Sequence, residues 1–319
     1  MNFIFVTSVL FIIVVSVTSI MQNRTDKFVS LCVQLLQRKP KMKFNFGDPT
    51  EHSWLIVLMR NISFLCSGAL ISSTHAISAA HCCATDKNRK TKAVVANLKV
   101  WVGVHNRLNF HSKYTVGYNV ESCSFHYINQ GFSINHLYGL ALIKTKKRIE
   151  FNFIVAPICL PTKNCQTDIS SCIDLKKYDV NSYGWGADRN IRLETPGLFP
   201  KSEPVWYLDK DKCKHKHFTK HSLIYYECVV GLNSKKTCLG LSGTPVIAVD
   251  KATKKTVLLG IIAAGPVCFH HVNIYKAYVI SVGALDHHLL PEETNDIKAK
   301  HDTQSEICTR SISKNITKQ

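Results

Sequence analysis

Negative charge is scarce in this chain: 22 acidic residues stand against 40 Lys and Arg residues over 319 positions, which gives a formal net charge of +18. The 13 cysteines include no Cys-x-x-Cys pair, which argues against a structural zinc site. Beyond residues 3–17, no stretch is long and apolar enough to span a membrane, and no internal repeat is visible. We therefore expect no metal, no cofactor and no membrane association.

The N-terminus indicates the compartment. Residues 3–17 are apolar apart from three hydroxyl-bearing side chains, and Val17-Thr18-Ser19 has the small residues of a signal-peptide cleavage site. An uncleaved membrane anchor is the alternative, but the run is shorter than the roughly 20 residues that span a bilayer. We expect residues 1–19 to be a signal peptide and the protein to be secreted into the extracellular space.

An oxidising compartment decides how the cysteines are interpreted, because secreted chains rich in cysteine use them for disulfides. Three Asn-x-Ser/Thr triplets are then candidate glycosylation sites, at Asn23, Asn61 and Asn315. The positive charge would suit nucleic acid, but we do not expect that partner outside the cell.

Short apolar runs, separated by turn-forming residues, fill the body of the chain between about residues 44 and 290. Runs at this spacing predict many short strands, as in an all-β barrel or sandwich. They are Leu55–Met59, Ala69–Ile71, Leu98–Val104, Leu140–Ile143, Val246–Val249 and Val257–Ile262. Residues 291–319 carry five acidic and five basic side chains and predict a disordered polar tail.

Two distant fragments carry the strongest functional signal. The first is Ile77-Ser78-Ala79-Ala80-His81-Cys82, in which the cysteine follows Cys66 by sixteen residues. The second is Cys238-Leu239-Gly240-Leu241-Ser242-Gly243-Thr244-Pro245. Together with Gly184-Trp185-Gly186 and Ala156–Pro161, they resemble the histidine and serine motifs of the trypsin/chymotrypsin family of serine peptidases. This resemblance covers residues 44–290.

The resemblance implies an all-β fold. Two antiparallel six-stranded β-barrels would span about residues 44–155 and 176–290, with a cleft between them. A C-terminal helix at roughly 279–289 would end the second barrel, and residues 20–43 would form a propeptide-like segment.

The resemblance also implies roles for individual residues. Ser242 would be the nucleophile and His81 the base that takes its proton. The backbone N–H groups of Gly240 and Ser242 would form the oxyanion hole. Lys236 would lie at the base of the specificity pocket. In an active enzyme, Lys236 would select substrates with an acidic side chain at the cleavage point. We favour the alternative, in which the pocket no longer binds a substrate and the Lys236 side chain turns outward.

The acid of the catalytic triad is missing. Leu140-Ala141-Leu142-Ile143-Lys144 resembles the family's strand after the catalytic aspartate, which puts Gly139 at the position of that acid. No Asp or Glu occurs at residues 123–147, and Ala263 occupies a second position from which a polar group could approach His81. In this family, replacing the aspartate by Asn already lowers kcat about 10⁴-fold.

The activation machinery of the family is missing as well. Leu241 stands where the family has an aspartate that pairs with the new N-terminus after zymogen cleavage. That N-terminus, Ile-Val-Gly-Gly in the family, has only Lys43–Gly47 as its nearest counterpart. We therefore predict a protease homologue with little or no peptidase activity, which acts by binding; a weakly active endopeptidase using a Ser242–His81 dyad is the alternative.

The family's disulfides imply partners for six cysteines: Cys66–Cys82, Cys213–Cys228 and Cys238–Cys268. Cys32 with Cys159 resembles a bridge between the propeptide and the body. Weaker guesses pair the remaining cysteines as Cys165–Cys172 and Cys83–Cys123, and leave Cys308 free or intermolecular.

The densest positive stretch is Lys210–His221, and Lys144–Arg148 forms a second cluster. Their summed field suits a polyanion, and we expect a heparin-like glycan at Lys210–Lys220 as a partner, beside a protein or peptide ligand in the cleft. Three histidines (His215, His217 and His221) suggest metal binding as a third function, but no acidic or thiolate ligand accompanies them. A solvated loop is the simplest alternative.

Overall fold

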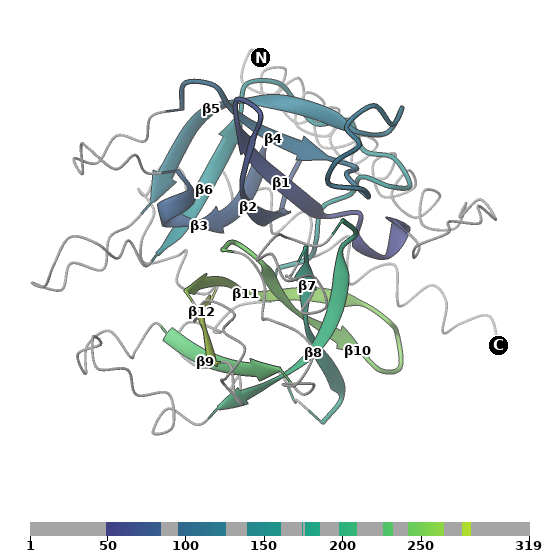
Figure 1. The fold of residues 1–319 in the computed structure, drawn as a ribbon. Coiled ribbons are helices and arrows are strands. Elements are labelled where there is room, and N and C mark those ends of the chain that lie inside the picture. Colours follow the sequence, from purple (N-terminus) through teal and green to yellow (C-terminus); the bar gives the residue numbers. More distant parts are fainter. Residues whose placement is uncertain are drawn as a thin grey trace, which may run out of the picture. The chain divides into compact units, whose positions relative to one another are not determined.

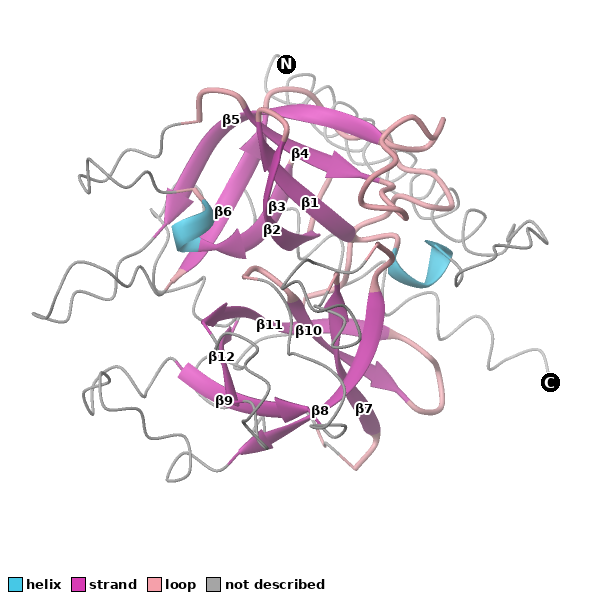
Figure 2. Ribbon diagram, viewed as in Figure 1, coloured by secondary structure: helices cyan, strands magenta, loops and turns pink. Residues whose placement is uncertain are grey.

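The computed structural model describes residues 49–83, 95–125, 139–160, 174, 176–185, 198–208, 226–231, 242–264 and 276–281. Strands dominate these residues, and the helices among them are two short 3-10 turns (Figures 1 and 2). No helix of the described part is long and apolar enough to cross a bilayer.

Six antiparallel strands close the first barrel, with neighbours in the order β1-β2-β3-β6-β5-β4. The strands are β1 Leu55–Arg60, β2 Ser63–Leu70, β3 His75–Ala79, β4 Leu98–Val102, β5 Val116–Phe125 and β6 Leu140–Thr145. One 3-10 helix, η1 (Pro49–His52), precedes β1, and a second, η2 (Ala80–Cys82), follows β3 directly.

A second closed barrel has the order β10-β11-β12-β9-β8-β7. Its strands are β7 Tyr178–Gly184, β8 Lys201–Leu208, β9 Tyr226–Gly231, β10 Pro245–Asp250, β11 Thr256–Ala264 and β12 Lys276–Ser281. Each pair of neighbouring strands in this barrel is antiparallel. The all-β fold of two six-stranded barrels is therefore confirmed.

Buried and exposed side chains alternate along some strands and not along others, depending on whether one or both faces of the strand are covered. In β4 the side chains inside the barrel are buried and Lys99 is exposed, as expected for a strand with one solvated face. β3 is buried at all five positions, because it also packs against β11 of the second barrel. The core that contains β1 and β3 extends to Trp185, Leu258 and other residues of the second barrel.

Aromatic contacts join the two barrels. The Tyr183 ring stacks on His52 with 5.1 Å between centroids, and its hydroxyl lies 3.2 Å from His52 Nδ1. Trp185, which is fully buried, meets Phe64 of β2 edge-on at 6.3 Å. Such pairs add roughly 0.5–1.5 kcal/mol beyond the area that they bury.

The predicted apolar runs fall in β1, β2, β4, β6, β10 and β11, which confirms them as strands. Two of the predicted strands extend too far: Ile71 lies after the end of β2, and residues 103–104 lie after the end of β4. The start predicted for the C-terminal helix was wrong: residues 279–281 belong to β12, where they pair with β9 and β11. Residues 1–43, the rest of that helix and the tail lie outside the described residues.

Candidate active site

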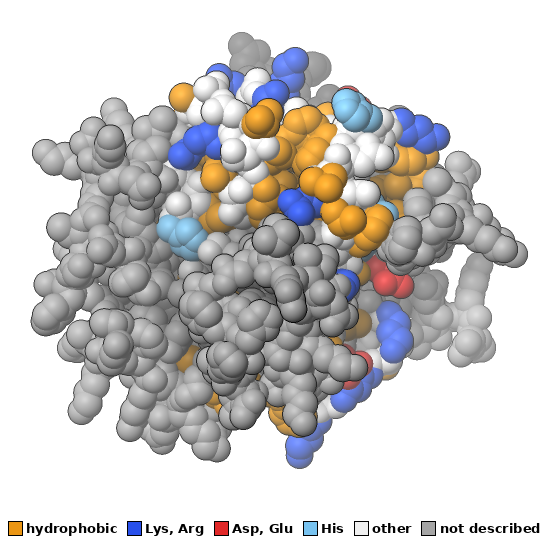
Figure 3. Space-filling model, viewed as in Figure 1, with side chains coloured by type: hydrophobic (Ala, Val, Ile, Leu, Met, Phe, Trp, Pro, Cys, Tyr) orange, Lys and Arg blue, Asp and Glu red, His pale blue; other side chains and the backbone are white. Residues whose placement is uncertain are grey.

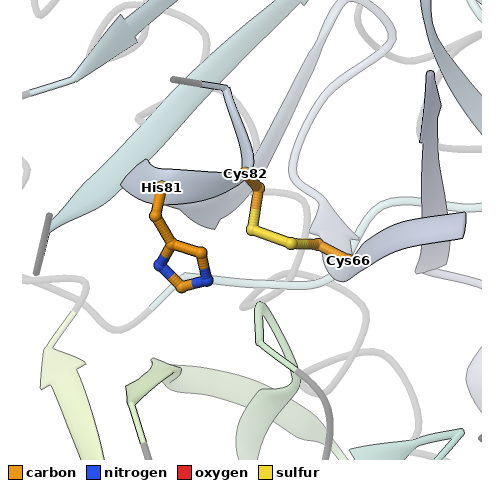
Figure 4. Close-up of side chains that lie close together, drawn as sticks. All are labelled: Cys66, His81 and Cys82. Carbon is orange, nitrogen blue, oxygen red and sulfur yellow. A yellow bond between two sulfur atoms is a disulfide. The ribbon is translucent and has the colours of Figure 1, made fainter. Parts of the chain in front are cut away.

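His81 sits in η2, immediately after β3, and is partly exposed (Figure 4). The β3–β6 ladder pairs Ala79 with Leu140, and one residue further the Ala80 N–H donates to the Gly139 carbonyl oxygen at 2.7 Å. The turn closes with a hydrogen bond from Cys83 N–H to Ala80 O at 3.1 Å. These backbone hydrogen bonds therefore position the η2 turn, which carries His81, relative to the start of β6.

The structure contains the expected Cys66–Cys82 disulfide, which ties β2 to the residue after His81 (Figure 4). The two Cα atoms are 6.1 Å apart and the bridge closes a separation of 16 residues. In the chain-entropy model a loop of this size contributes about 3 kcal/mol of stability. The Cys83–Cys123 pair, a guess from the sequence, is also bonded and joins the same turn to β5.

Cys66, His81 and Cys82 bring their potential ligand atoms within 4.8 Å of one another. A metal would need thiolates from the cysteines, but their sulfur atoms are bonded to each other. This group therefore has the chemistry of a disulfide beside an imidazole and not that of a metal centre.

The segment Ser242–Gly243 is held by backbone hydrogen bonds to both barrels. The N–H of Ser67, in β2, donates to Ser242 O at 3.0 Å, and Gly243 N–H donates to Ile262 O at 2.8 Å. Since Ser67 follows Cys66, two consecutive residues of β2 position the two candidate catalytic segments. Cys66 anchors the turn that carries His81, and Ser67 anchors Ser242.

Gly243 has a structural reason to be glycine. Its φ of +85° lies in the left-handed region, and a Cβ at this position would overlap the carbonyl oxygen of Ser67. The Ser78 hydroxyl, which donates to that same carbonyl at 2.7 Å, would also be in the way. The serine loop can approach β2 and β3 this closely only without a side chain after Ser242.

Gly184 allows a second close approach at the same junction. A Cβ there would lie 3.0 Å from Thr244 Oγ1 and 3.6 Å from Ser67 Oγ. The Gly184-Trp185 landmark of the sequence therefore packs β7 against the serine loop and β2.

Gly139, the predicted position of the triad acid, is buried. Ala263, at the second position considered, is 2% exposed and apolar. Neither position supplies a carboxylate. Residues 126–138, outside the described part, contain no Asp or Glu in their sequence.

Acidic and phenolic groups inside the second barrel were not anticipated from the sequence. Glu203 in β8 and Glu227 in β9 are each only 8% exposed. Burial, and then the negative charge of Glu227, hold the pKa of Tyr207 well above its ordinary value. The alternation of Glu203, Val205 and Tyr207 along β8 was the available signal, since alternate residues of a strand share a face.

Several predicted site residues lie outside the described part of the chain. They are Gly240, Leu241, Lys236, Cys213, Cys238, Cys268, Asn23, Asn315 and the stretch Lys210–Lys220. Cys159 and Cys228 are each in a disulfide. Of the predicted sequons, Asn61 is described and exposed.

A family model described as Trypsin matches residues 45–280. A CLIP domain-containing serine protease B14 of Anopheles gambiae is 25% identical over 219 residues, which cover 62% of this chain and 58% of that protein. Clotting factor G beta subunit of Tachypleus tridentatus is 25% identical over 239 residues, which cover 70% of this chain and 71% of that protein. The chain thus spans less than two thirds of the mosquito protein's length.

The Spaetzle-processing enzyme of Drosophila melanogaster is 24% identical over 213 residues, covering 62% of this chain and 52% of that one. Among solved structures, neuropsin, a serine protease expressed in the limbic system of mouse brain, aligns with a TM-score of 0.54. It is 18% identical, and the alignment covers 74% of this chain and 92% of that one. At this identity the likeness concerns the fold alone.

Proposed function

Because the chain belongs to the trypsin family, we propose that it is a secreted serine protease homologue with little or no peptidase activity. It acts by binding, either a protein or peptide ligand between its barrels or a polyanionic glycan on its basic surface. The scaffold that presents His81 and Ser242 is retained, while the group that would activate them is absent.

One observation carries the proposal: Gly139 is paired to the backbone that leads into His81. The hydrogen bond from Ala80 N–H holds Gly139 directly before the first residue of β6 and beside the turn that carries His81, which supports its assignment to the position of the acid. An acid at this position orients the imidazole and stabilises the imidazolium that forms during catalysis. Glycine can do neither, and Ala263 offers no polar substitute.

The sequence around the serine supports the same proposal. Leu241 has no carboxylate to receive a new N-terminal ammonium, and the Ile-Val-Gly-Gly sequence that would supply it is absent. Without that ion pair the family's route to an ordered oxyanion loop is missing. Loss of one oxyanion donor alone typically costs 10²–10³-fold in rate.

Charge on the first barrel supports glycan binding. Lys146, Lys147 and Arg148 are consecutive and exposed at the end of β6, and none of them makes an ion pair within the described part of the chain. Lys146 N–H donates to Asn119 O, and Asn119 pairs with the exposed Lys99, so a fourth cation lies one strand further along. Lys and Arg side chains are visible on this barrel in Figure 3.

Secretion is supported by the disulfides. Cys66–Cys82 and Cys83–Cys123 are both formed, and such bonds persist mainly in oxidising compartments. The apolar residues 3–17 supply a candidate leader.

The alternative, a weak endopeptidase with a Ser242–His81 dyad, is favoured by one observation. Adjacent residues of β2, Cys66 and Ser67, still hold the two catalytic segments. Family members that lose a triad residue retain about 10³–10⁴-fold catalysis over water from binding and the oxyanion hole.

A fluorophosphonate probe separates the two functions, because it reacts only with an activated serine hydroxyl. The secreted full chain and its Ser242→Ala variant are treated in parallel, with an active trypsin-like protease as the positive control. The proposal predicts no labelling of either chain. Labelling of the wild-type chain alone would establish the weak endopeptidase instead.

A further inference from the structure

The turn between β1 and β2 holds the triplet Asn61-Ile62-Ser63. The ladder pairs Arg60 with Ser63, so Asn61 and Ile62 alone make the connection. Asn61 has φ of +54°, the left-handed conformation that asparagine adopts more readily than most residues. Its backbone N–H donates to Asn97 O at 3.0 Å. The acceptor asparagine of a glycosylation triplet therefore lies at the tip of a tight hairpin.

All three residues of the triplet are exposed, in contrast to the interior of the strand before it. Leu58 is fully buried and Met59 is 8% exposed, whereas Ile62 is 92% exposed. The Asn61 side-chain amide makes no hydrogen bond within the described residues. A large substituent on Asn61 Nδ2 would consequently displace no packing and break no hydrogen bond.

We propose that Asn61 carries an N-linked glycan. The oligosaccharide comes from a polyprenyl-pyrophosphate donor: a bond forms between Asn61 Nδ2 and the first sugar carbon, the bond from that carbon to the pyrophosphate oxygen breaks, and Nδ2 loses one proton. Ser63 supplies the hydroxyl of the Asn-x-Ser/Thr acceptor sequence.

A glycan at this position would also cover an exposed apolar side chain. Ile62 is the most exposed of the large apolar side chains in the described residues, and it follows Asn61 directly in the sequence. A hydrophilic glycan on Asn61 would shield it from self-association.

The glycan is compatible with the candidate active site. Ser67 lies six residues from Asn61 along β2, or about 20 Å at the rise of a strand. The glycan rests on the secretion proposed above, because the oligosaccharide is transferred in the secretory pathway. Its occupancy is independent of whether Ser242 is reactive, so an inactive serine and a glycosylated Asn61 are tested separately.

The test uses the full chain expressed in mammalian cells, with both the secreted and the cell-retained protein analysed. Treatment with peptide:N-glycosidase F in heavy-oxygen water converts a glycosylated asparagine into a mass-labelled aspartate. We expect the label at Asn61, its loss in Ser63→Ala and in Asn61→Gln, and its retention in Ser63→Thr.

Asn97→Gln is the matched control, because Asn97 is also exposed, also has a positive φ and contacts the same turn, but does not begin an acceptor triplet. It should leave the label in place. An unlabelled Asn61 in the wild-type chain from both protein fractions would overturn the proposal, whether or not Asn23 or Asn315 is labelled.

Discussion

Ala80 donates its backbone N–H to the carbonyl oxygen of Gly139 at 2.7 Å, one residue before the candidate general base. This bond extends the β3–β6 ladder into η2 and holds Gly139, the residue that we assign to the position of the catalytic acid, beside the turn that carries His81. Under this assignment no carboxylate orients His81 from position 139, although the backbone pairing and the Cys66–Cys82 disulfide around the histidine are formed.

Restoring the acid should recover little activity. In Gly139→Asp a carboxylate would enter a buried position beside the His81 turn, but Leu241 would still leave the oxyanion loop without its ion pair. We expect a gain in kcat/KM far below the roughly 10⁴-fold associated with the acid in this family. The gain is measured as peptide hydrolysis by Gly139→Asp, with the double variant Gly139→Asp/Ser242→Ala as the control that lacks the serine hydroxyl. A large Ser242-dependent gain would mean that Leu241 matters less than argued.

Gly243→Ala should be strongly destabilising. The substitution forces a side chain into a positive φ and against the Ser67 carbonyl, so we expect a loss above about 1 kcal/mol in the free energy of unfolding. Gly184→Ala is the control, because its Cβ would meet Thr244 Oγ1 at 3.0 Å without a positive φ. Urea unfolding followed by tryptophan fluorescence compares them. Equal effects would show that the left-handed backbone at Gly243 is not the cause.

Removing the Cys66–Cys82 bridge should lower stability by about 3 kcal/mol, the entropy effect of a loop of this length. The variant replaces both cysteines by serine, which avoids leaving a free thiol. The double variant of Cys83 and Cys123 is its counterpart. It should lose somewhat more free energy of unfolding, since that bridge closes a separation of 40 residues. Thermal unfolding under oxidising conditions gives both values. A Cys66/Cys82 variant as stable as the wild type would contradict the prediction.

The β10–β11 turn should lose stability in acid. Hydrogen bonds from the N–H groups of Thr253 and Ala252 hold the pKa of Asp250 below its ordinary value. A depressed pKa in the folded state means that the stabilisation is complete above the unfolded-state pKa of about 3.9 and disappears as pH falls through the folded value. Asp250→Asn should therefore be less stable than the wild type at pH 6, and this difference should shrink below pH 4. A difference that does not change with pH would contradict the prediction.

Heparin affinity should depend on the cations after β6. Replacing Lys146, Lys147 and Arg148 by alanine should lower the salt concentration that elutes the protein from heparin, because each contact with a sulfate releases about one counterion. The matched control replaces Lys177, Lys251 and Lys254, near which Asp174, Asp179 and Asp250 supply negative charge. Equal losses in the two triple variants would indicate a nonspecific effect of net charge.

The strands could be predicted from the sequence because their signals are local, whereas their arrangement as two barrels came from the family resemblance. Alternation in Leu98–Val102 and the apolar runs of β1 and β11 reflect side-chain burial along single strands. The start of the predicted C-terminal helix failed at residues 279–281, since pairing with two neighbouring strands decides their conformation and no local pattern reports it.

The candidate site was predictable in part for the same reason. His81, Ser242 and the empty acid position at Gly139 follow from contiguous motifs. The role of Ser67 does not, because its bond to Ser242 joins residues that only the docking of two barrels brings together. The burial of Glu203 and Glu227 could not be predicted from the sequence either, because burial in a closed barrel depends on the register of several strands.

Steady-state hydrolysis of a peptide library by the full secreted chain, measured beside Ser242→Ala, tests the central claim most directly. The account predicts the same rate for the two proteins, because without an acid at position 139 the imidazole of His81 is not oriented to take the serine proton. A wild-type rate well above that of Ser242→Ala would contradict it and would assign the chain a working catalytic serine.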